Sequence, residues 1–359
     1  MEKKQKKKYI QIIILSIAII VFATSIIFTS AISKGIKNVL FKSDIRANEE
    51  DLVVHFVDVG QGDAIAITFP NGKVMIIDSG PKDSQNKLVE YIKNNIISSN
   101  NDLTIDYAIL THSDLDHSGG MSALFGEFEI KTFFRPNIAS KSENSNNFAI
   151  ETDLLEYDEL IKLAQKEKGL EIYTIDEEYR LFIEDVLVEI FPPIKKYDTT
   201  NEMSPIIKIS YLNKSFLFTG DIQGDSENDM LNYYGTDLDA DVLKVAHHGS
   251  NTSTSEQFAQ MVSPKYAVIC VGSNTYGHPH LSVISTLQDV GAKVYTTQNS
   301  SVRIVCGPKI FGLLNEIKIQ SYEFVDWWII ALVVDIILIL YLIKVIVQIV
   351  IERKKQNKI

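Results

Sequence analysis

The central part of the chain alternates short apolar runs, rich in β-branched residues, with longer stretches of helical periodicity. Apolar runs of about four to eight residues between Gly, Pro or Asn turns predict strands. Helical spacing is clearest in residues 148–168, where Leu154 and Ile161 lie on one face. We expect strands at 52–59, 64–69, 73–78, 105–110, 172–175, 186–191, 205–212, 215–219, 241–246, 266–271, 292–296 and 302–305, and helices at 83–98, 148–168, 224–234, 254–262 and 282–290. This pattern predicts either two sheets covered by helices or one mixed α/β sheet.

Two long apolar segments, residues 10–33 and 327–350, flank this central part. Each is long enough to cross a hydrocarbon core about 30 Å thick, so we expect a transmembrane helix near each end. For the first segment the alternative is a cleaved signal peptide, because Ala31-Ile32-Ser33 forms a small-residue site. For the second it is an amphipathic core helix, because Lys344 and Gln348 interrupt it. The predicted organisation is a basic tip (1–9), a transmembrane signal anchor (10–33), a linker (34–50), a folded domain (51–320), a second transmembrane helix (327–350) and a basic tail (351–359).

Charge is divided between the ends of the chain and its middle. The formal net charge is −11, but residues 34–325 hold 25 of the 35 basic and 42 of the 46 acidic residues, a net charge of −17. Basic flanks of membrane spans stay in the cytoplasm. We therefore expect a cell-membrane protein with both termini cytoplasmic and an acidic extracytoplasmic domain. With 45% apolar residues and two cysteines, the composition excludes a disordered chain and a disulfide scaffold.

Asp335 lies near the middle of the second predicted span, where inserting a carboxyl group costs roughly 2.5–3.5 kcal/mol. The first predicted span offers no cation to pair with it. We expect either a protonated Asp335 or a polar contact with a membrane protein partner. A tolerated lone acid is the alternative.

Six of the seven histidines fall in three short stretches, each close behind a predicted strand. Loops at strand ends are where sites are commonly assembled in such sheets. The stretch 111–120 places four imidazole or carboxylate groups within six residues, a charge density that suits two metal ions better than a core. His55, the seventh histidine, alternates with apolar residues in the first predicted strand and is expected to be structural.

These motifs carry a family resemblance. His-Ser-Asp-Leu-Asp-His (112–117) resembles the metal motif of the metallo-β-lactamase fold, with Asp114 where the second His usually stands. Together with Asp-Val-Gly-Gln-Gly-Asp (58–63) and Ala-His-His-Gly-Ser (246–250), it resembles the extracytoplasmic hydrolase domain of ComEC-type competence proteins. Ile-Asp-Ser-Gly (77–80), Thr-Gly-Asp (219–221) and Tyr-Gly-His-Pro-His (276–280) extend the likeness over about residues 51–310. The resemblance implies an αββα sandwich and a metal-dependent hydrolase, a class that includes nucleases within this family.

The resemblance also implies roles for individual residues. His112 and Asp114 match ligands of a first metal, Asp116 and His117 match ligands of a second, and Asp221 matches the carboxylate that bridges them. One of His247 and His248 should be the last ligand, and we favour His247, with its neighbour touching substrate. Asp78 matches an acid that orients the ligand loop, with Asp58, Asp63 and Ser204 as further supports of the ligands. The alternatives are a turn residue for Asp78 and a helix N-cap for Asp221.

One ligand of the fold is missing. No His occurs between His117 and His247, and Asn201-Glu202-Met203-Ser204 occupies the place of a usual His ligand, so we expect a loosely held first metal. Oxygen-rich ligands suit Mn²⁺ or Mg²⁺, whereas imidazoles accept Zn²⁺. We expect two divalent ions, Mn²⁺ or Zn²⁺.

These features predict a membrane-anchored metal-dependent hydrolase that activates water with two ions. Asp116, His278 and His280 are the expected catalytic residues. One of the two histidines would protonate a leaving group or bind a phosphate; the alternative is that Gly277-His278-Pro279 is simply a rigid turn. We expect a phosphodiesterase or nuclease acting on single-stranded or short DNA, because the acidic domain is unsuited to a long duplex. With only two predicted spans, it is not expected to form a DNA channel by itself. The alternatives are a phosphodiesterase acting on phosphorylcholine or teichoic acid of the envelope, and a non-catalytic metal-binding membrane adaptor.

Overall fold

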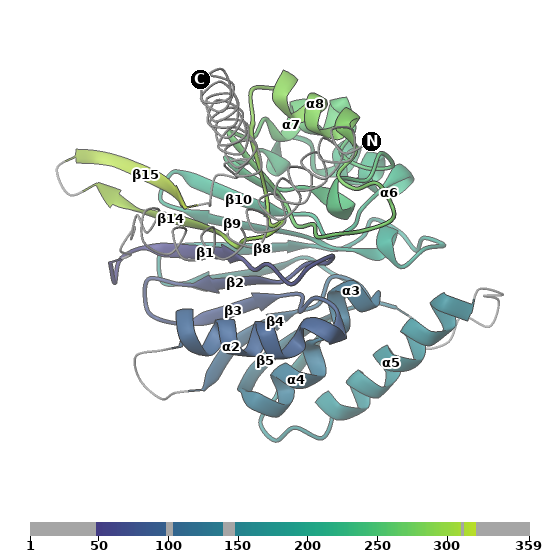
Figure 1. The fold of residues 1–359 in the computed structure, drawn as a ribbon. Coiled ribbons are helices and arrows are strands. Elements are labelled where there is room, and N and C mark those ends of the chain that lie inside the picture. Colours follow the sequence, from purple (N-terminus) through teal and green to yellow (C-terminus); the bar gives the residue numbers. More distant parts are fainter. Residues whose placement is uncertain (1–47, 98–102, 139–147, 310–311, 321–359) are drawn as a thin grey trace, which may run out of the picture. The chain divides into compact units, whose positions relative to one another are not determined.

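Two mixed β-sheets stack face to face, with helices on both outer faces (Figure 1). This computed structural model describes residues 48–97, 103–138, 148–309 and 312–320, all within one compact unit. The layers form the αββα sandwich that the resemblance implied. Of the two arrangements left open by the strand pattern, the structure therefore has two sheets.

The first sheet has the strand order β15-β14-β1-β2-β3-β4-β5-β6. Neighbours from β15 to β3 are antiparallel, and neighbours from β3 to β6 are parallel. Its strands are β1 (Leu52–Phe56), β2 (Ile65–Thr68), β3 (Val74–Ile77), β4 (Thr104–Ile109), β5 (Glu129–Pro136), β6 (Glu171–Ile175), β14 (Val302–Lys309) and β15 (Gly312–Gln320).

The second sheet has the order β13-β12-β11-β10-β9-β8-β7. Its pairing changes from antiparallel to parallel at β10, as that of the first sheet does at β3. The strands are β7 (Tyr179–Ile183), β8 (Val186–Phe191), β9 (Ile206–Tyr211), β10 (Lys214–Phe218), β11 (Val242–Lys244), β12 (Tyr266–Ile269) and β13 (Lys293–Thr296). The carboxyl ends of parallel strands meet at one edge, where α/β sheets commonly bind ligands.

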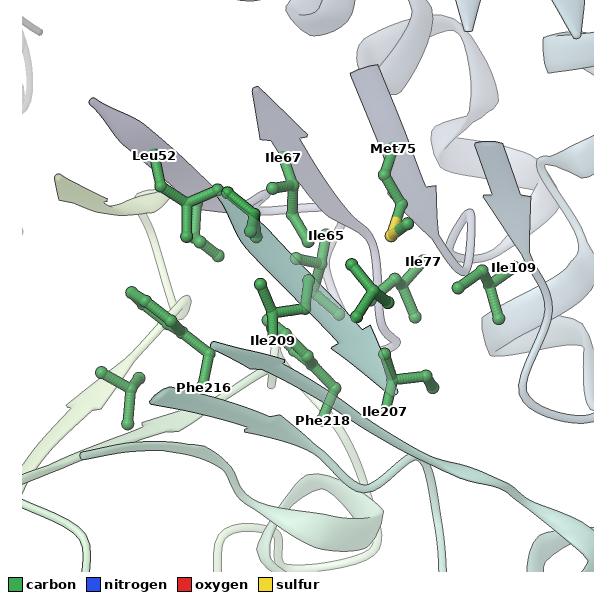
Figure 2. Close-up of a cluster of buried hydrophobic side chains, with 14 of the residues drawn as sticks. Leu52, Ile65, Ile67, Met75, Ile77, Ile109, Ile207, Ile209, Phe216 and Phe218 are labelled. Atoms are coloured by element: carbon green, nitrogen blue, oxygen red, sulfur yellow. The ribbon is translucent and has the colours of Figure 1, made fainter. Parts of the chain in front are cut away.

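Alternate residues of each strand face different apolar layers. In β2, Ile65 and Ile67 face the layer between the sheets, whereas Ala66 faces the helices of the first sheet. Figure 2 shows the layer between the sheets, where Leu52, Ile65, Ile67, Met75, Ile77 and Ile109 of the first sheet face Ile207, Ile209, Phe216 and Phe218 of the second. The β-branched runs thus form strands that are buried on both faces.

Helices bury their apolar faces against the outer side of each sheet. The first sheet is covered by α2 (Gln85–Asn95), α4 (Met121–Glu127) and α5 (Phe148–Ala164), and the second by α6 (Gly224–Tyr234), α7 (Glu256–Val262) and α8 (Leu281–Asp289). Short turns complete the connections: α3 (Leu115–Ser118), η1 (Lys82–Ser84), η2 (Asn201–Met203), η3 (Gly235–Leu238) and η4 (Ala246–Gly249).

Most predicted elements are present, but three strands were missed. β5, β7 and β15 contain charged residues that break the apolar pattern, as Arg180 does in β7. Tertiary pairing with a neighbouring strand forms them despite that weak local signal.

The predicted membrane spans, 10–33 and 327–350, and with them Asp335, lie outside the described residues. Within the described ranges, none of the helices combines the length and apolar character needed to cross a bilayer.

Replacing Phe216 by Ala tests the core between the sheets. Phe216 is fully buried in that layer, so Phe216→Ala should lower the free energy of unfolding by about 3–5 kcal/mol through lost burial and a residual cavity. Urea denaturation followed by circular dichroism measures the change. In the control Phe182→Ala, the ring is 77% exposed, and the change should stay within about 0.5 kcal/mol. Equal losses in both variants would contradict the proposed packing.

His55 gives the fold a pH dependence. It is 4% exposed in β1, and its Nδ1 lies 2.9 Å from the hydroxyl of Tyr91, which agrees with a structural role. Burial, reinforced by the charge of Arg303, lowers the pKa of His55 to about 3. In the unfolded chain His55 has an ordinary pKa of about 6.5. Between pH 6.5 and about 3 the unfolded chain therefore binds a proton at His55 that the folded chain does not bind, so the free energy of unfolding decreases as the pH is lowered through this range.

Lowering the pH from 7 to 5 should therefore remove about 2 kcal/mol of unfolding free energy through His55 alone. In the variant His55→Gln this part of the loss should disappear, because Gln does not titrate. Chemical denaturation of both proteins at the two pH values gives the comparison. An identical loss in the variant would show that His55 is not the group responsible.

Candidate metal centre

The candidate ligands stand at strand ends of both sheets. Asp78 directly follows β3, and the loop 111–117 follows β4. In the second sheet, Asp221 follows β10, and His248 follows β11. The two sheets therefore each contribute side chains to one site at their common edge.

Four of these side chains converge on one point. Nε2 of His117 and Nε2 of His248 lie 3.3 Å and 3.4 Å from Oδ2 of Asp221, and 3.3 Å from each other. Nε2 of His248 also lies 3.1 Å from Oδ2 of Asp116. His117, His248 and Asp221 are buried, so their polar atoms have little access to water.

His112 and Asp114 extend the cluster on the side of His117. The rings of His112 and His117 lie 4.1 Å apart, and His112, His117 and Asp221 each offer one ligand atom within 4.8 Å of the others. Nε2 of His112 is buried without a hydrogen-bond partner among the described residues and lies 3.8 Å from Oδ2 of Asp114. The hydroxyl of Thr200 donates to Oδ1 of Asp114 at 2.5 Å and fixes that carboxylate.

Asp78 holds two histidines from behind. His117 donates from Nδ1 to Oδ2 of Asp78 at 2.8 Å. The hydroxyl of Thr111 donates to the same oxygen at 2.8 Å and lies 3.0 Å from Nδ1 of His112, so it is placed to accept a hydrogen bond from the N–H of that ring. Asp78 thereby turns Nε2 of both rings toward Asp221, as carboxylates do behind metal-binding histidines.

The other histidine supports come from the second sheet. Nδ1 of His248 donates to the carbonyl oxygen of Cys270 at 2.8 Å, which leaves its Nε2 facing Asp221. The hydroxyl of Ser204 lies 3.2 Å from Nδ1 of His112 and accepts a hydrogen bond from the backbone N–H of Asp221 at 3.2 Å. Each of the three imidazoles is thus fixed through Nδ1 and presents Nε2.

Burial and the neighbouring charges together shift the pKa values of the cluster in different directions. Burial and the charge of His117 lower the pKa of His112 to about 3, so its imidazole is neutral at pH 7. For His117 and His248 burial acts the same way, but the facing Asp221 raises the pKa of both well above the ordinary value. Burial also opposes ionisation of Asp221, yet His248 and His117 hold its pKa well below the usual range. A metal ion would replace the protons on His117 and His248.

These residues fit two divalent ions. The buried lone pair of His112 and the convergence of His117, His248 and Asp221 are the arrangement that imidazole- and carboxylate-binding ions require. A second possible group, Asp63 with His117 and His248, uses the Nδ1 side of the rings. That side is already engaged by Asp78 and by the carbonyl of Cys270, so the Nε2 side is the metal side.

The backbone of η4 separates the roles of the adjacent histidines. His247 and His248 both adopt left-handed conformations, with φ of 48° and 52°, which are uncommon for residues other than glycine. His248 enters the buried cluster, whereas the His247 side chain is 22% exposed and its Nε2 lies 3.9 Å from Oδ2 of Asp221. The geometry favours His248 as the last ligand, whereas His247 was the ligand expected from the sequence.

Gly220 makes room for this arrangement. It has φ of +50°, and a Cβ there would lie 2.8 Å from Cβ of Ser204 and 3.0 Å from Cβ of Thr111. The Gly before Asp221 is therefore required by both conformation and space.

The structure brings most of the predicted site residues together, with two departures. The carboxylate of Asp58 pairs with Lys87 of α2 at 3.1 Å and accepts a hydrogen bond from the backbone N–H of Gly60, so this side chain is engaged by its own loop and by α2. A pocket of about 650 Å³ is lined by Asp116, Asp221 and His248 of the cluster and also by His278. His280, which immediately precedes α8, is not among its lining residues.

Sequence reasoning missed Lys244 and Asp153. Lys244 ends β11 and is fully buried against Asp63 and Asp221. A single charged residue in the apolar run Val242–Ala246 was the available signal. Asp153, on α5, lines the pocket, and burial together with Asp114 and Asp116 raises its pKa to about 7. It belongs to no motif, so only the fold reveals it.

Removing the support behind the histidines should weaken metal binding. Asp78→Ala deletes the acceptor for His117 and Thr111, so we expect affinity for Mn²⁺ or Zn²⁺ to fall about 10- to 100-fold. Calorimetric titration of the metal-stripped protein measures this. Asp58→Ala is the matched control and should leave the affinity unchanged within about twofold. A larger loss in the control would place Asp58 in the site after all.

Comparison with known proteins agrees with this geometry. The profile of the Metallo-beta-lactamase superfamily matches residues 57–273. The chain is 29% identical over 265 residues to ComE operon protein 3 of Bacillus subtilis and 28% identical over 293 residues to Recombination protein 2 of Haemophilus influenzae. These alignments cover 70% and 77% of this chain but 32% and 31% of the relatives, so the chain spans about a third of their length.

Two solved structures are also similar to the chain. One is the metallo-beta-lactamase fold protein YhfI of Bacillus subtilis, with a TM-score of 0.43 and 13% identity, covering 69% of this chain and 98% of that protein. The other is Zn²⁺-bound PqqB of Methylobacterium extorquens, with a TM-score of 0.43 and 12% identity, covering 67% of this chain and 97% of that protein. Because the superfamily profile covers more than half of its residues, the chain belongs to the metallo-β-lactamase superfamily, and its domain is a distant homologue of the ComEC-type competence proteins.

Proposed function

We propose that this protein is a phosphodiesterase that uses two divalent ions, Mn²⁺ or Zn²⁺, to cleave short or single-stranded DNA. The observation that carries the proposal is a pocket of about 650 Å³ whose lining includes Asp116, Asp221 and His248 of the buried cluster. A pocket of this size accommodates a phosphate with one or two attached groups.

Two overlapping sets of residues would hold the ions. His112 and Asp114 would hold one, and Asp116, His117 and His248 the other, with Asp221 shared between them. Bound there, such ions supply charge stabilisation for phosphate oxygens and lower the pKa of water to about 7. The first ion is expected to be held less tightly, because this chain lacks one of the usual His ligands. Asn201 is one of the residues in that place, and its amide nitrogen lies 3.3 Å from Nε2 of His247.

Two further histidines would orient the substrate. The rings of His247 and His278 lie 5.6 Å apart, and both line the pocket. Burial and the neighbouring imidazoles lower the pKa of His278 to about 4, so at neutral pH it offers one N–H and one lone pair. A neutral His278 would hydrogen-bond a phosphate or leaving-group oxygen, and His280 would support it from the start of α8, since their rings lie 5.5 Å apart.

The composition of the pocket favours a short substrate. Its lining, as far as the described residues show it, contains neither Lys nor Arg, so an anionic substrate would depend on the metal ions for charge. Long duplexes are held mainly by basic side chains, which this site lacks within that lining. Tyr276 lines the pocket with 70% of its surface exposed and is suited to stacking against one base of a single strand.

A second candidate substrate is a phosphorylcholine ester or teichoic acid of the cell envelope. Asp153 and Tyr276, both in the lining of this pocket, supply a carboxyl group and an exposed aromatic ring. Aromatic faces attract quaternary ammonium groups such as choline.

For either substrate the proposed location of the domain is extracytoplasmic. The predicted spans at 10–33 and 327–350 would anchor it in the membrane, and Asp335 would contact a membrane protein partner.

The test uses the full chain, stripped of metal and reloaded with Mn²⁺ or Zn²⁺. Single-stranded DNA, duplex DNA, bis-nitrophenyl phosphate and nitrophenyl phosphorylcholine are assayed side by side. We expect metal-dependent turnover of single-stranded DNA and of bis-nitrophenyl phosphate, and its loss in Asp116→Ala and Asp221→Ala. Asp229→Ala, which removes a carboxylate of α6 that pairs with Lys195, should retain turnover.

Each outcome has a defined meaning. Turnover of nitrophenyl phosphorylcholine without cleavage of DNA would replace the proposed substrate by the second candidate. Turnover retained in Asp221→Ala would contradict the assigned site. Absence of turnover with all four substrates would contradict an enzymatic role and favour the metal-binding adaptor.

A further inference from the structure

The ammonium group of Lys244 lies directly beneath the candidate metal centre. Lys244 is the last residue of β11 and is fully buried. Its Nζ donates to the carbonyl oxygen of Gly220 at 2.9 Å and lies 3.5 Å from Oδ1 of Asp221. The same Nζ forms an ion pair with Oδ2 of Asp63.

The three contacts satisfy the ammonium group completely. An ammonium carries three N–H donors and no acceptor, and here three oxygens surround it. A buried charge is tolerated only when it is paired and hydrogen-bonded in this way. Lys244 therefore has one well-defined position. It does not line the substrate pocket.

That position determines how Asp221 is oriented. Oδ1 of Asp221 faces Lys244, while Oδ2 faces Nε2 of His117 and Nε2 of His248 at 3.3 Å and 3.4 Å. The backbone N–H of Asp221 is held separately by the hydroxyl of Ser204. The rotation of the carboxylate about its own axis is thus set by Lys244 on one side and by the imidazoles on the other.

We propose that Lys244 is a positioning residue: it engages Oδ1 of Asp221 and so leaves only Oδ2 of this carboxylate available to a metal ion. An ion that contacts Asp221 then does so through Oδ2. The contact with Asp63, which belongs to the first sheet's loop after β1, ties this orientation to the opposite sheet. The inference concerns metal binding and does not depend on which substrate is cleaved.

The experiment separates positioning from charge balance. Lys244→Met leaves Asp63 and Asp221 without their shared cation, so the metal-free protein should melt at a lower temperature than the wild type. The double variant Lys244→Met/Asp63→Asn removes both members of the buried pair and should recover much of that melting temperature. Because neither variant can hold Oδ1 of Asp221, both should bind Mn²⁺ or Zn²⁺ about 10- to 100-fold more weakly in calorimetric titrations of the full chain.

Two outcomes would overturn the proposal. If the double variant binds the ions as the wild type does, Lys244 merely balances the charge of Asp63. If both Lys244 variants fail to fold, Asp63→Asn decides, since it keeps Lys244 on Gly220 and Asp221 and should retain affinity within about threefold. A tenfold or larger loss in Asp63→Asn would assign the effect to Asp63 instead.

Lys214→Met is the matched control. Lys214 pairs with Asp241 at 3.3 Å, beside the opposite end of β11, and therefore tests the loss of a lysine–aspartate pair in the same sheet. Metal affinity should be unchanged in this variant. An equal loss of affinity in Lys214→Met would show that the sheet as a whole, and not Lys244, governs the site.

Discussion

Burying several carboxylates at one edge of the sandwich is the constraint around which the site is built. Asp63, Asp78 and Asp221 are all nearly inaccessible to water, so each needs nearby N–H donors or positive charge. Asp78 obtains them from Thr111 and His117, and Asp221 from Lys244 and two imidazoles. The hydrogen bonds that satisfy these acids are the same ones that aim the imidazoles, so stability of the core and geometry of the site have a common origin.

The architecture could largely be predicted from the sequence, because the apolar runs that indicate strands and the helical spacing that indicates helices are both local signals. Runs such as Val74–Ile77 are buried on both faces, which makes them continuously apolar and easy to recognise. β7 was missed because it lies at the edge of its sheet, where Phe182 and Arg180 are exposed and no apolar run results. The choice between one sheet and two could not be made from the strand pattern, since it depends on which strands pair across long sequence separations. The resemblance to a known fold supplied that information.

The site was predictable as a set of loops but less so as a geometry. Strand ends placed His112–His117, Asp221 and the His pair together, and the structure agrees. Spacing alone could not choose between His247 and His248, because the choice depends on two left-handed backbone conformations in η4. Asp58 and Asp63 stand in the same motif, yet one pairs with Lys87 and the other with Lys244. Such partners come from distant segments, which no local pattern encodes.

Contributions from both sheets have a mechanical consequence. Asp116 and His117 follow a strand of the first sheet, whereas Asp221 and His248 follow strands of the second. Ions bound between these residues would cross-link the two sheets, in addition to the apolar layer that already joins them. An ion at a hundred times its dissociation constant adds about 2.7 kcal/mol to the stability of the state that binds it. The protein would then be more rigid and would unfold less readily where metal is plentiful. Its resistance to unfolding would therefore vary with the metal content of its surroundings.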